Sequence, residues 1–179
     1  MGINKLAVVG ATGNVGREML NILSERDFPC EEVIALASER SEGDAVPFGN
    51  KELIVQNLSS YDFSETSIAL FSAGGQISEV YGPIAAEQGC IVIDNSSKFR
   101  MDNDVPLIVP EVNIEMLEHY RTTNIIANPN CSTIQMVVAL KPLEDLASIN
   151  RINVSTYQST SGAGKAAMEE LFNQTKGIF

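Results

Sequence analysis

One cysteine of this chain stands where a thiol could act as a nucleophile. Cys131 lies in the run Asn-Pro-Asn-Cys-Ser-Thr at 128–133, between an apolar stretch at 125–127 and a helical pattern. A thiol at the start of a helix meets unpaired N–H groups and a partial positive charge, which favour the thiolate that attacks carbon. The alternative is a small buried hydrophobic residue, as we expect for Cys90 beside a strand and for Cys30 in a loop. Cys131 alone favours neither interpretation, so the rest of the chain has to decide.

A second chemical motif follows the first apolar stretch of the chain. Gly10, Gly13 and Gly16 have the spacing G-x-x-G-x-x-G and precede a helical pattern. Such glycines let the backbone turn tightly and approach a pyrophosphate, whose charge the helix N-terminus balances. A plain glycine turn is the alternative, but the strand, loop and helix context favours a dinucleotide site. The candidate cofactor contacts of this loop are Gly10, Thr12, Gly13, Asn14 and Val15.

Polar residues after the second predicted strand, 33–37, bear on the choice of cofactor. Arg40 supplies positive charge, and Ser38 and Ser41 supply hydroxyl donors, which together suit the additional phosphate of NADP. Glu39 opposes this interpretation unless its carboxylate points away, and an exposed polar turn is the alternative for the whole segment. We therefore expect NADP as the cofactor.

These motifs lie far apart in the chain, so a fold has to bring their strand ends together. The sequence predicts such a fold, because short apolar strands alternate with helical stretches along the chain. We expect strands at 6–9, 33–37, 53–55, 68–71, 91–94, 107–109 and 125–127. Helical spacing appears at 15–23 and again at 77–85, where Pro83 should kink or split the helix. The alternation predicts an α/β fold with a Rossmann-type, doubly wound, mostly parallel sheet.

The pattern changes after Pro142. It predicts a longer strand at 149–157 and then a helix at 165–176. We therefore expect an NADP-binding domain at 1–130, followed at 131–179 by the first part of an incomplete α+β catalytic or dimerisation domain. A domain that opens without further strands suggests a fragment of a longer protein.

Composition excludes several classes of protein. The 179 residues carry a formal charge of −11 without a basic cluster, so we do not expect nucleic acid as a partner. No apolar run is long enough to cross a bilayer, and the N-terminus lacks a signal-peptide pattern. Three widely spaced cysteines form neither a disulfide framework nor a metal-ligand pattern, so we expect no metal and a reducing cytoplasm.

Taken together, the motifs are similar to those of aspartate-semialdehyde dehydrogenase, and the whole chain resembles the N-terminal half of that family's enzymes. The matching runs are GATGNVG at 10–16, ASERS at 37–41, SAGG at 72–75, DNSSKFRMD at 94–102, NPNCST at 128–133 and QSTSGAG at 158–164. Two relatives with the same architecture fit less well. N-acetyl-glutamyl-phosphate reductase has a Gly-Cys-Tyr segment around its cysteine, and glyceraldehyde-phosphate dehydrogenase has a different cysteine motif and phosphate loop.

The resemblance implies a reversible reaction, the NADP-dependent reductive dephosphorylation of β-aspartyl phosphate to aspartate semialdehyde and phosphate. It implies that Cys131 forms a thioester, with Asn130 beside the oxyanion, and that Gln158 orients the substrate. It also implies that Arg100 binds the phosphate group, for which a guanidinium fork is suited. Further implied cofactor contacts are Ser72, Ala73, Gly74, Ser161 and Gly162. A strand-end polar residue is the alternative for Gln158, and a surface arginine is the alternative for Arg100.

The resemblance breaks at the family's general base, its substrate-binding arginine and its phosphate-binding lysine, which belong to the half of the enzyme that this chain does not match. The one histidine, His119, lies outside every matching run, and we expect it to be ordinary and exposed. The chain alone should therefore be nearly inactive, and the full-length enzyme should be a homodimer. The alternatives are a non-catalytic dinucleotide-binding module, which would need neither Cys131 nor Gln158, and the related reductase acting on a longer acyl phosphate.

Overall fold

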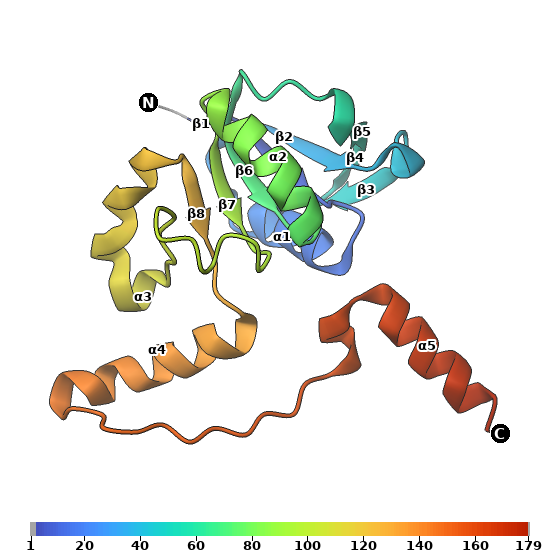
Figure 1. The fold of residues 1–179 in the computed structure, drawn as a ribbon. Helices are drawn as coiled ribbons and strands as arrows, with labels where there is room; N and C mark the ends of the chain where they lie inside the picture. Colours follow the sequence, from blue (N-terminus) through green and yellow to red (C-terminus); the bar gives the residue numbers. More distant parts are fainter. Residues whose placement is uncertain (1–2, 179) are drawn as a thin grey trace.

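The computed structural model describes residues 3–178, and its centre is a six-stranded sheet (Figure 1). The strands are β1 Ile3–Val9, β2 Cys30–Ala37, β5 Gln56–Asn57, β6 Thr66–Phe71, β7 Ile91–Asp94 and β8 Ile125–Ala127. They lie in the order β5-β2-β1-β6-β7-β8, and every neighbouring pair is parallel. The order reverses direction beside β1, so the predicted doubly wound α/β sheet is confirmed.

β1 lies inside the sheet because its residues are apolar on both faces. Leu6 and Val8 pack with Leu20 on one face, whereas Ala7 and Val9 belong to the core on the other face. The four β1 residues are at most 1% exposed. A central parallel strand is covered by helices on both sides, which explains its continuous rather than alternating apolar sequence.

Two helices provide this cover, α1 Asn14–Glu25 on one face and α2 Gly75–Glu87 on the other. α2 continues through Pro83, so of the predicted kink or split the split is wrong. A proline removes one backbone hydrogen bond. Burial of Ala85 and Ala86 against the sheet on the C-terminal side of Pro83 holds the helix together.

Three short segments differ from the prediction. The strand expected at 53–55 is β4 Lys51–Ile54, which pairs with β3 Ala45–Phe48 in a separate antiparallel hairpin. Leu107 makes only an isolated bridge to Ala127, because Pro110 soon begins the short helix α3 Pro110–Asn113. Cys30, expected in a loop, begins β2. The 3-10 helix η3 Ile114–Thr122 then leads to β8.

Residues after β8 extend away from the sheet (Figure 1). They form α4 Cys131–Leu146, an extended segment, the 3-10 turn η4 Thr160–Ala163 and α5 Lys165–Lys176, which confirms the helix predicted at 165–176. The strand predicted at 149–157 is wrong, since no described residue pairs with this segment and a strand needs a hydrogen-bonded neighbour. Its apolar side chains are open to solvent, with Val154 63% exposed.

Candidate dinucleotide cleft and cysteine site

The glycine loop joins β1 to α1 and packs tightly against its neighbours. Gly10 has a φ of +86°, and its N–H donates to the carbonyl of Leu36 at 2.8 Å. A Cβ on Gly16 would lie 2.2 Å from the oxygen of Gly10, so only glycine permits this approach of helix to loop. The cap residue Gly13 has no side chain, which leaves the first N–H groups of α1 for an anion.

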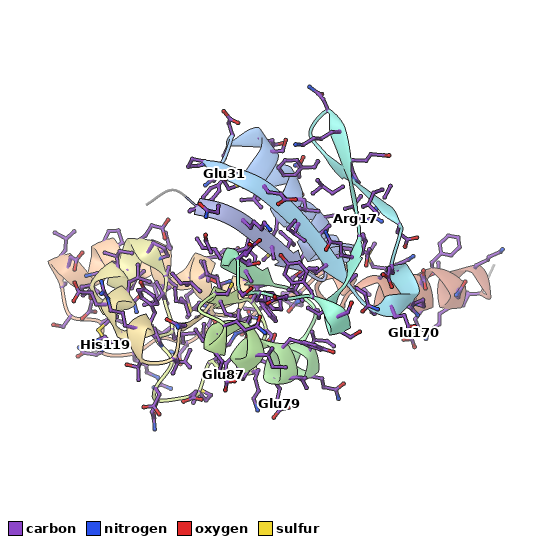
Figure 2. All side chains as sticks on the ribbon, turned by 90° about the horizontal axis from the view of Figure 1, so that it is seen from above. Arg17, Glu31, Glu79, Glu87, His119 and Glu170 are labelled. Atoms are coloured by element: carbon purple, nitrogen blue, oxygen red, sulfur yellow. The ribbon has the colours of Figure 1, made fainter. Side chains whose placement is uncertain are left out.

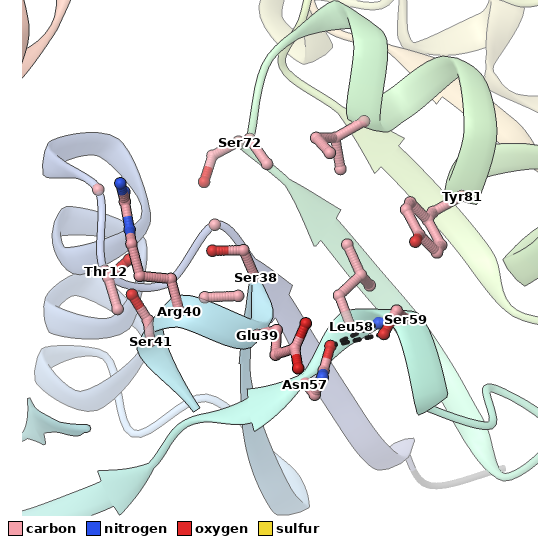
Figure 3. A pocket seen from close by; sticks show the side chains of 15 residues that line it. Thr12, Ser38, Glu39, Arg40, Ser41, Asn57, Leu58, Ser59, Ser72 and Tyr81 are labelled. Atoms are coloured by element: carbon pink, nitrogen blue, oxygen red, sulfur yellow. Dashed lines mark hydrogen bonds between the residues drawn. The ribbon is translucent and has the colours of Figure 1, made fainter. Parts of the chain in front are cut away.

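A cleft of about 510 Å³ opens beside this loop (Figure 3). Eight of the predicted cofactor residues line it: Gly10, Thr12, Gly13, Ser38, Arg40, Ser41, Ser72 and Ala73. They come from the ends of β1, β2 and β6, because neighbouring parallel strands end at the same edge of the sheet. The predicted contacts Asn14, Val15, Gly74, Ser161 and Gly162 are not among the residues that line the cleft.

Seven further residues line the cleft without having been predicted as cofactor contacts. They are Ala37, Glu39, Asn57, Leu58, Ser59, Ile77 and Tyr81. Asn57 caps the 3-10 turn η2 Leu58–Ser60, since its side-chain oxygen accepts the N–H of Ser59 at 3.0 Å. β5 is only two residues long, so no apolar periodicity reveals it. The asparagine two residues before a serine was the available signal, since that pattern is typical of a side-chain-capped turn.

Glu39 and Arg40 belong to one 3-10 turn, η1 Glu39–Ser41. Figure 3 shows the Arg40 side chain on the side of Thr12 and the Glu39 carboxylate on the side of Asn57. The carboxylate therefore points away from the guanidinium. This is the condition under which Glu39 does not oppose a phosphate at Arg40.

Cys131 is exposed and is the first residue of α4, so the predicted helix start is confirmed. The side-chain oxygen of Asn130 caps the helix by accepting the N–H of Ser132 at 3.0 Å, and the Sγ of Cys131 lies 4.0 Å from this oxygen. The other thiols differ. Burial raises the pKa of Cys90 to about 12, and burial also raises the pKa of Cys30.

Arg100 is held between the ends of β7 and β8. Its Nε donates to the carbonyl of Asn128 at 2.9 Å, and its Nη2 donates to the carbonyl of Asn95 at 3.1 Å. A guanidinium has five N–H donors. Within residues 3–178 the other three have no hydrogen-bond partner, so they are available to an anion. Asn128, whose carbonyl Arg100 holds, lies three residues before Cys131 in the chain.

Gln158 lies in the exposed C-terminal segment. Its side chain packs on Gly162, where a Cβ would lie 1.9 Å from Nε2. The segment approaches the glycine loop through α5, since Asn14 Nδ2 donates to the Sδ of Met168 at 3.7 Å. Among the described residues no hydrogen bond joins Gln158 to Cys131.

The remaining titratable groups form no second centre in the described part of the chain. His119 is exposed in η3 at the periphery, as predicted (Figure 2). Residues 3–178 contain no group of three or more histidine, cysteine, aspartate or glutamate residues able to hold a metal ion. Nor does this range contain a helix with the length and apolar character needed to cross a membrane.

A glycine loop at the end of a central parallel strand, with a cleft across the neighbouring strand ends, defines a dinucleotide-binding α/β protein. Two family models match the chain. The model described as semialdehyde dehydrogenase, NAD binding domain, covers residues 5–120, and the one described as semialdehyde dehydrogenase, dimerisation domain, covers residues 140–178.

Known proteins narrow this class. Aspartate-semialdehyde dehydrogenase 2 of Vibrio cholerae is 59% identical over 170 residues, which are 95% of this chain and 50% of that protein. The crystal structure of aspartate semialdehyde dehydrogenase II complexed with ASA, from Vibrio cholerae, has a TM-score of 0.95 at 56% identity and matches 99% of this chain and 53% of that one. The Candida albicans enzyme with NADP has a TM-score of 0.71 at 26% identity, over 82% of this chain and 48% of that one.

The chain therefore belongs to the aspartate-semialdehyde dehydrogenase family. It spans about half the length of the curated relatives it matches. The two family models correspond to the NAD-binding domain and to part of the dimerisation domain.

Proposed function

We propose that this chain is the cofactor-binding and nucleophile-bearing half of an enzyme that interconverts β-aspartyl phosphate and aspartate semialdehyde. The observation that carries the proposal is the exposed Cys131 at the first position of α4, next to a capping Asn130. A module that only binds a dinucleotide has no use for an exposed thiol at a helix start. The relatives at 56–59% identity carry the same enzyme name, which supports this substrate over the longer acyl phosphate of the sister reductase.

The residues of the site divide the chemistry between them. The Sγ of Cys131 attacks the acyl carbon, the bond from that carbon to the phosphate oxygen breaks, and inorganic phosphate leaves with the electron pair. The N–H groups at the start of α4 and the Asn130 amide stabilise the oxyanion. Arg100 binds the phosphate group with its unpartnered donors, and Gln158 orients the acyl group. Bound NADPH supplies the hydride that reduces the resulting thioester.

The cofactor cleft has the donors that NADP requires. The N–H groups at the start of α1 meet the pyrophosphate, with Asn14 and Val15 in the first turn. Ser38, Arg40 and Ser41 meet the additional phosphate of NADP, and the direction of Glu39 supports this assignment. Ser72, Ala73 and Gly74 lie beside the middle of the cofactor, and Ser161 and Gly162 approach its nicotinamide end.

The general base, one substrate-binding arginine and one phosphate-binding lysine of the family find no match in this chain. The chain alone therefore forms the thioester but turns over little, since the later stage needs a proton carrier. The complete enzyme is a homodimer, and the cysteine pattern favours a reducing cytoplasm.

Covalent trapping tests this function. The purified chain is incubated with β-aspartyl phosphate, and intact mass and peptide mapping then locate the acyl group. We expect one aspartyl adduct on Cys131 and none in Cys131→Ser. Adduct formation with N-acetyl-glutamyl phosphate instead would identify the sister enzyme, and NADP binding without any adduct would identify a non-catalytic module.

A further inference from the structure

Asn95 and Asn128 pair their side chains across the ends of β7 and β8. The Nδ2 of Asn128 donates to the Oδ1 of Asn95 at 2.6 Å. The two main chains are also fixed, since Asn128 N–H donates to the carbonyl of Asp94 at 2.8 Å and Asn95 N–H donates to that of Phe71 at 2.9 Å. The last residues of β6 and β7 and the residue after β8 therefore form one hydrogen-bonded network.

Arg100 closes a ring with these two asparagines. Nε and Nη2, which belong to one rigid plane, donate to the carbonyls of Asn128 and Asn95. Because the guanidinium is planar, the two bonds fix the separation and orientation of both carbonyls. We call Asn95, Arg100 and Asn128 the asparagine clasp.

The β7 side of the asparagine clasp is anchored in the core. Asp94 is fully buried, and its carboxylate accepts the hydroxyl of Ser78 at 2.6 Å, the hydroxyl of Ser96 at 2.6 Å and the N–H of Ser96 at 3.1 Å. Ser78 belongs to α2. The carboxylate thus fixes the end of β7 to a helix, and Asn95 follows it directly.

The β8 side of the clasp leads directly to the thiol. Only Pro129 and Asn130 separate Asn128 from Cys131, Pro129 is buried, and its ring fixes φ. α4 itself has no buried residue, so core packing does not determine where this helix begins. The position of the helix start is therefore set by the link from Asn128 to Cys131.

We propose that the asparagine clasp positions Cys131, and that Asn95 and Asn128 are positioning residues for the thiol that make no contact with the substrate. The catalytic meaning of this role rests on the proposed function, whereas the positioning is a property of the chain itself. Displacement of Asn128 moves the Asn130 cap, and with it the N–H groups of Ser132 and Ile134 that bond to Asn130.

Amide hydrogen exchange in the 15N-labelled chain tests the positioning directly. In Asn128→Ala and in Asn95→Ala we expect exchange at Ser132 and Ile134 to accelerate about tenfold, with the strand amides of β1 unchanged. In the double variant exchange should be only slightly faster than in the faster single variant, because both substitutions remove the same Asn95–Asn128 hydrogen bond. Asn128→Asp should restore slow exchange, since a turned Asn95 amide can donate to the new carboxylate.

Asn113→Ala is the matched control. The side chain of Asn113 makes two hydrogen bonds, both at 2.9 Å and both to backbone: its Oδ1 accepts the N–H of Val109, and its Nδ2 donates to the carbonyl of Leu107. Its loss should leave exchange at Ser132 and Ile134 unchanged. Equal acceleration in Asn113→Ala and Asn128→Ala, or no acceleration in either clasp variant, would overturn the proposal.

Acylation kinetics separate this proposal from the proposed function. With β-aspartyl phosphate, Asn128→Ala should lower the maximal acylation rate of Cys131 about tenfold and leave the half-saturating concentration nearly unchanged. An unaltered chain that is never acylated refutes the proposed function, whatever the exchange data show. Normal acylation of Asn128→Ala in a chain that is acylated refutes the clasp.

Discussion

Glu39 and Arg40 are neighbours in one 3-10 turn, yet their side chains extend in opposite directions at the cofactor cleft (Figure 3). We therefore expect the preference for NADP over NAD to depend on Arg40 and not on Glu39. In Arg40→Ala we expect the Kd for NADP to rise about tenfold or more and the Kd for NAD to change little, since one charge-assisted contact is lost. Titration calorimetry measures both.

Two variants control this experiment. Arg26 is an exposed arginine just after α1, so Arg26→Ala should leave both dissociation constants unchanged. Glu39→Gln should alter NADP binding little, because its carboxylate lies away from Arg40. A Glu39→Gln chain that binds NADP much more tightly would mean that the carboxylate does repel the phosphate.

The three cysteines should react with alkylating reagents in the order of their exposure. Cys131 is exposed, Cys30 is half-buried and Cys90 is fully buried. Near neutral pH, iodoacetamide should modify Cys131 first and Cys90 only after the chain unfolds. Peptide mapping of timed samples gives the order, and early modification of Cys90 in the folded chain would contradict the buried position.

The buried thiol of Cys90 should make stability fall in alkaline solution. In the unfolded chain a thiol loses its proton near pH 9, whereas burial raises the pKa of Cys90 in the folded chain to about 12. Below pH 9 both states hold the proton, so the free energy of unfolding is unaffected. Above it only the unfolded state is deprotonated, and the free energy of unfolding falls by up to about 1.4 kcal/mol per pH unit.

Urea unfolding at a series of pH values measures this slope. Cys90→Ala changes the stability at every pH by removing the packed sulfur, so only the difference in slope above pH 9 is informative. We expect a shallower slope in the variant. Identical slopes in the two proteins would show that Cys90 is not the group responsible.

The carboxylate of Asp94 should contribute strongly to stability. It is fully buried and accepts three hydrogen bonds from Ser78 and Ser96. Asp94→Ala leaves two buried hydroxyls without their acceptor, and we expect a loss of about 3 kcal/mol in the free energy of unfolding. Asp62 is the control, because its exposed carboxylate accepts a hydrogen bond from the nearby Ser64. Asp62→Ala should therefore lower the free energy of unfolding much less.

Local sequence predicts most of the parallel sheet and several of its connections. The strands at 6–9, 33–37, 68–71, 91–94 and 125–127 are apolar runs, interrupted only by Asp94 at the end of the fourth, which is what burial on both faces of a sheet requires. The start of α4 at Cys131 and the helix at 165–176 also follow from local signals, namely a capping asparagine and helical spacing.

The sequence-based predictions of secondary structure were wrong where a residue's conformation depends on a partner that is distant in the chain. Residues 149–157 alternate like a strand but find no neighbour among the described residues. α2 passes through Pro83 because buried alanines hold it to the sheet. Neither fact is visible in a window of ten residues.

The sequence by itself determined the family, the parallel strands and the nucleophile candidate Cys131, because these follow from the residue types and spacing of several short runs along the chain. The tertiary structure alone decided that Asn57, Leu58 and Ser59 line the cleft and that Glu39 points away from Arg40. It also decided that Asn95 meets Asn128. The reason is that these relationships join strand ends far apart in the chain, and the sheet order that brings them together is set by core packing as a whole.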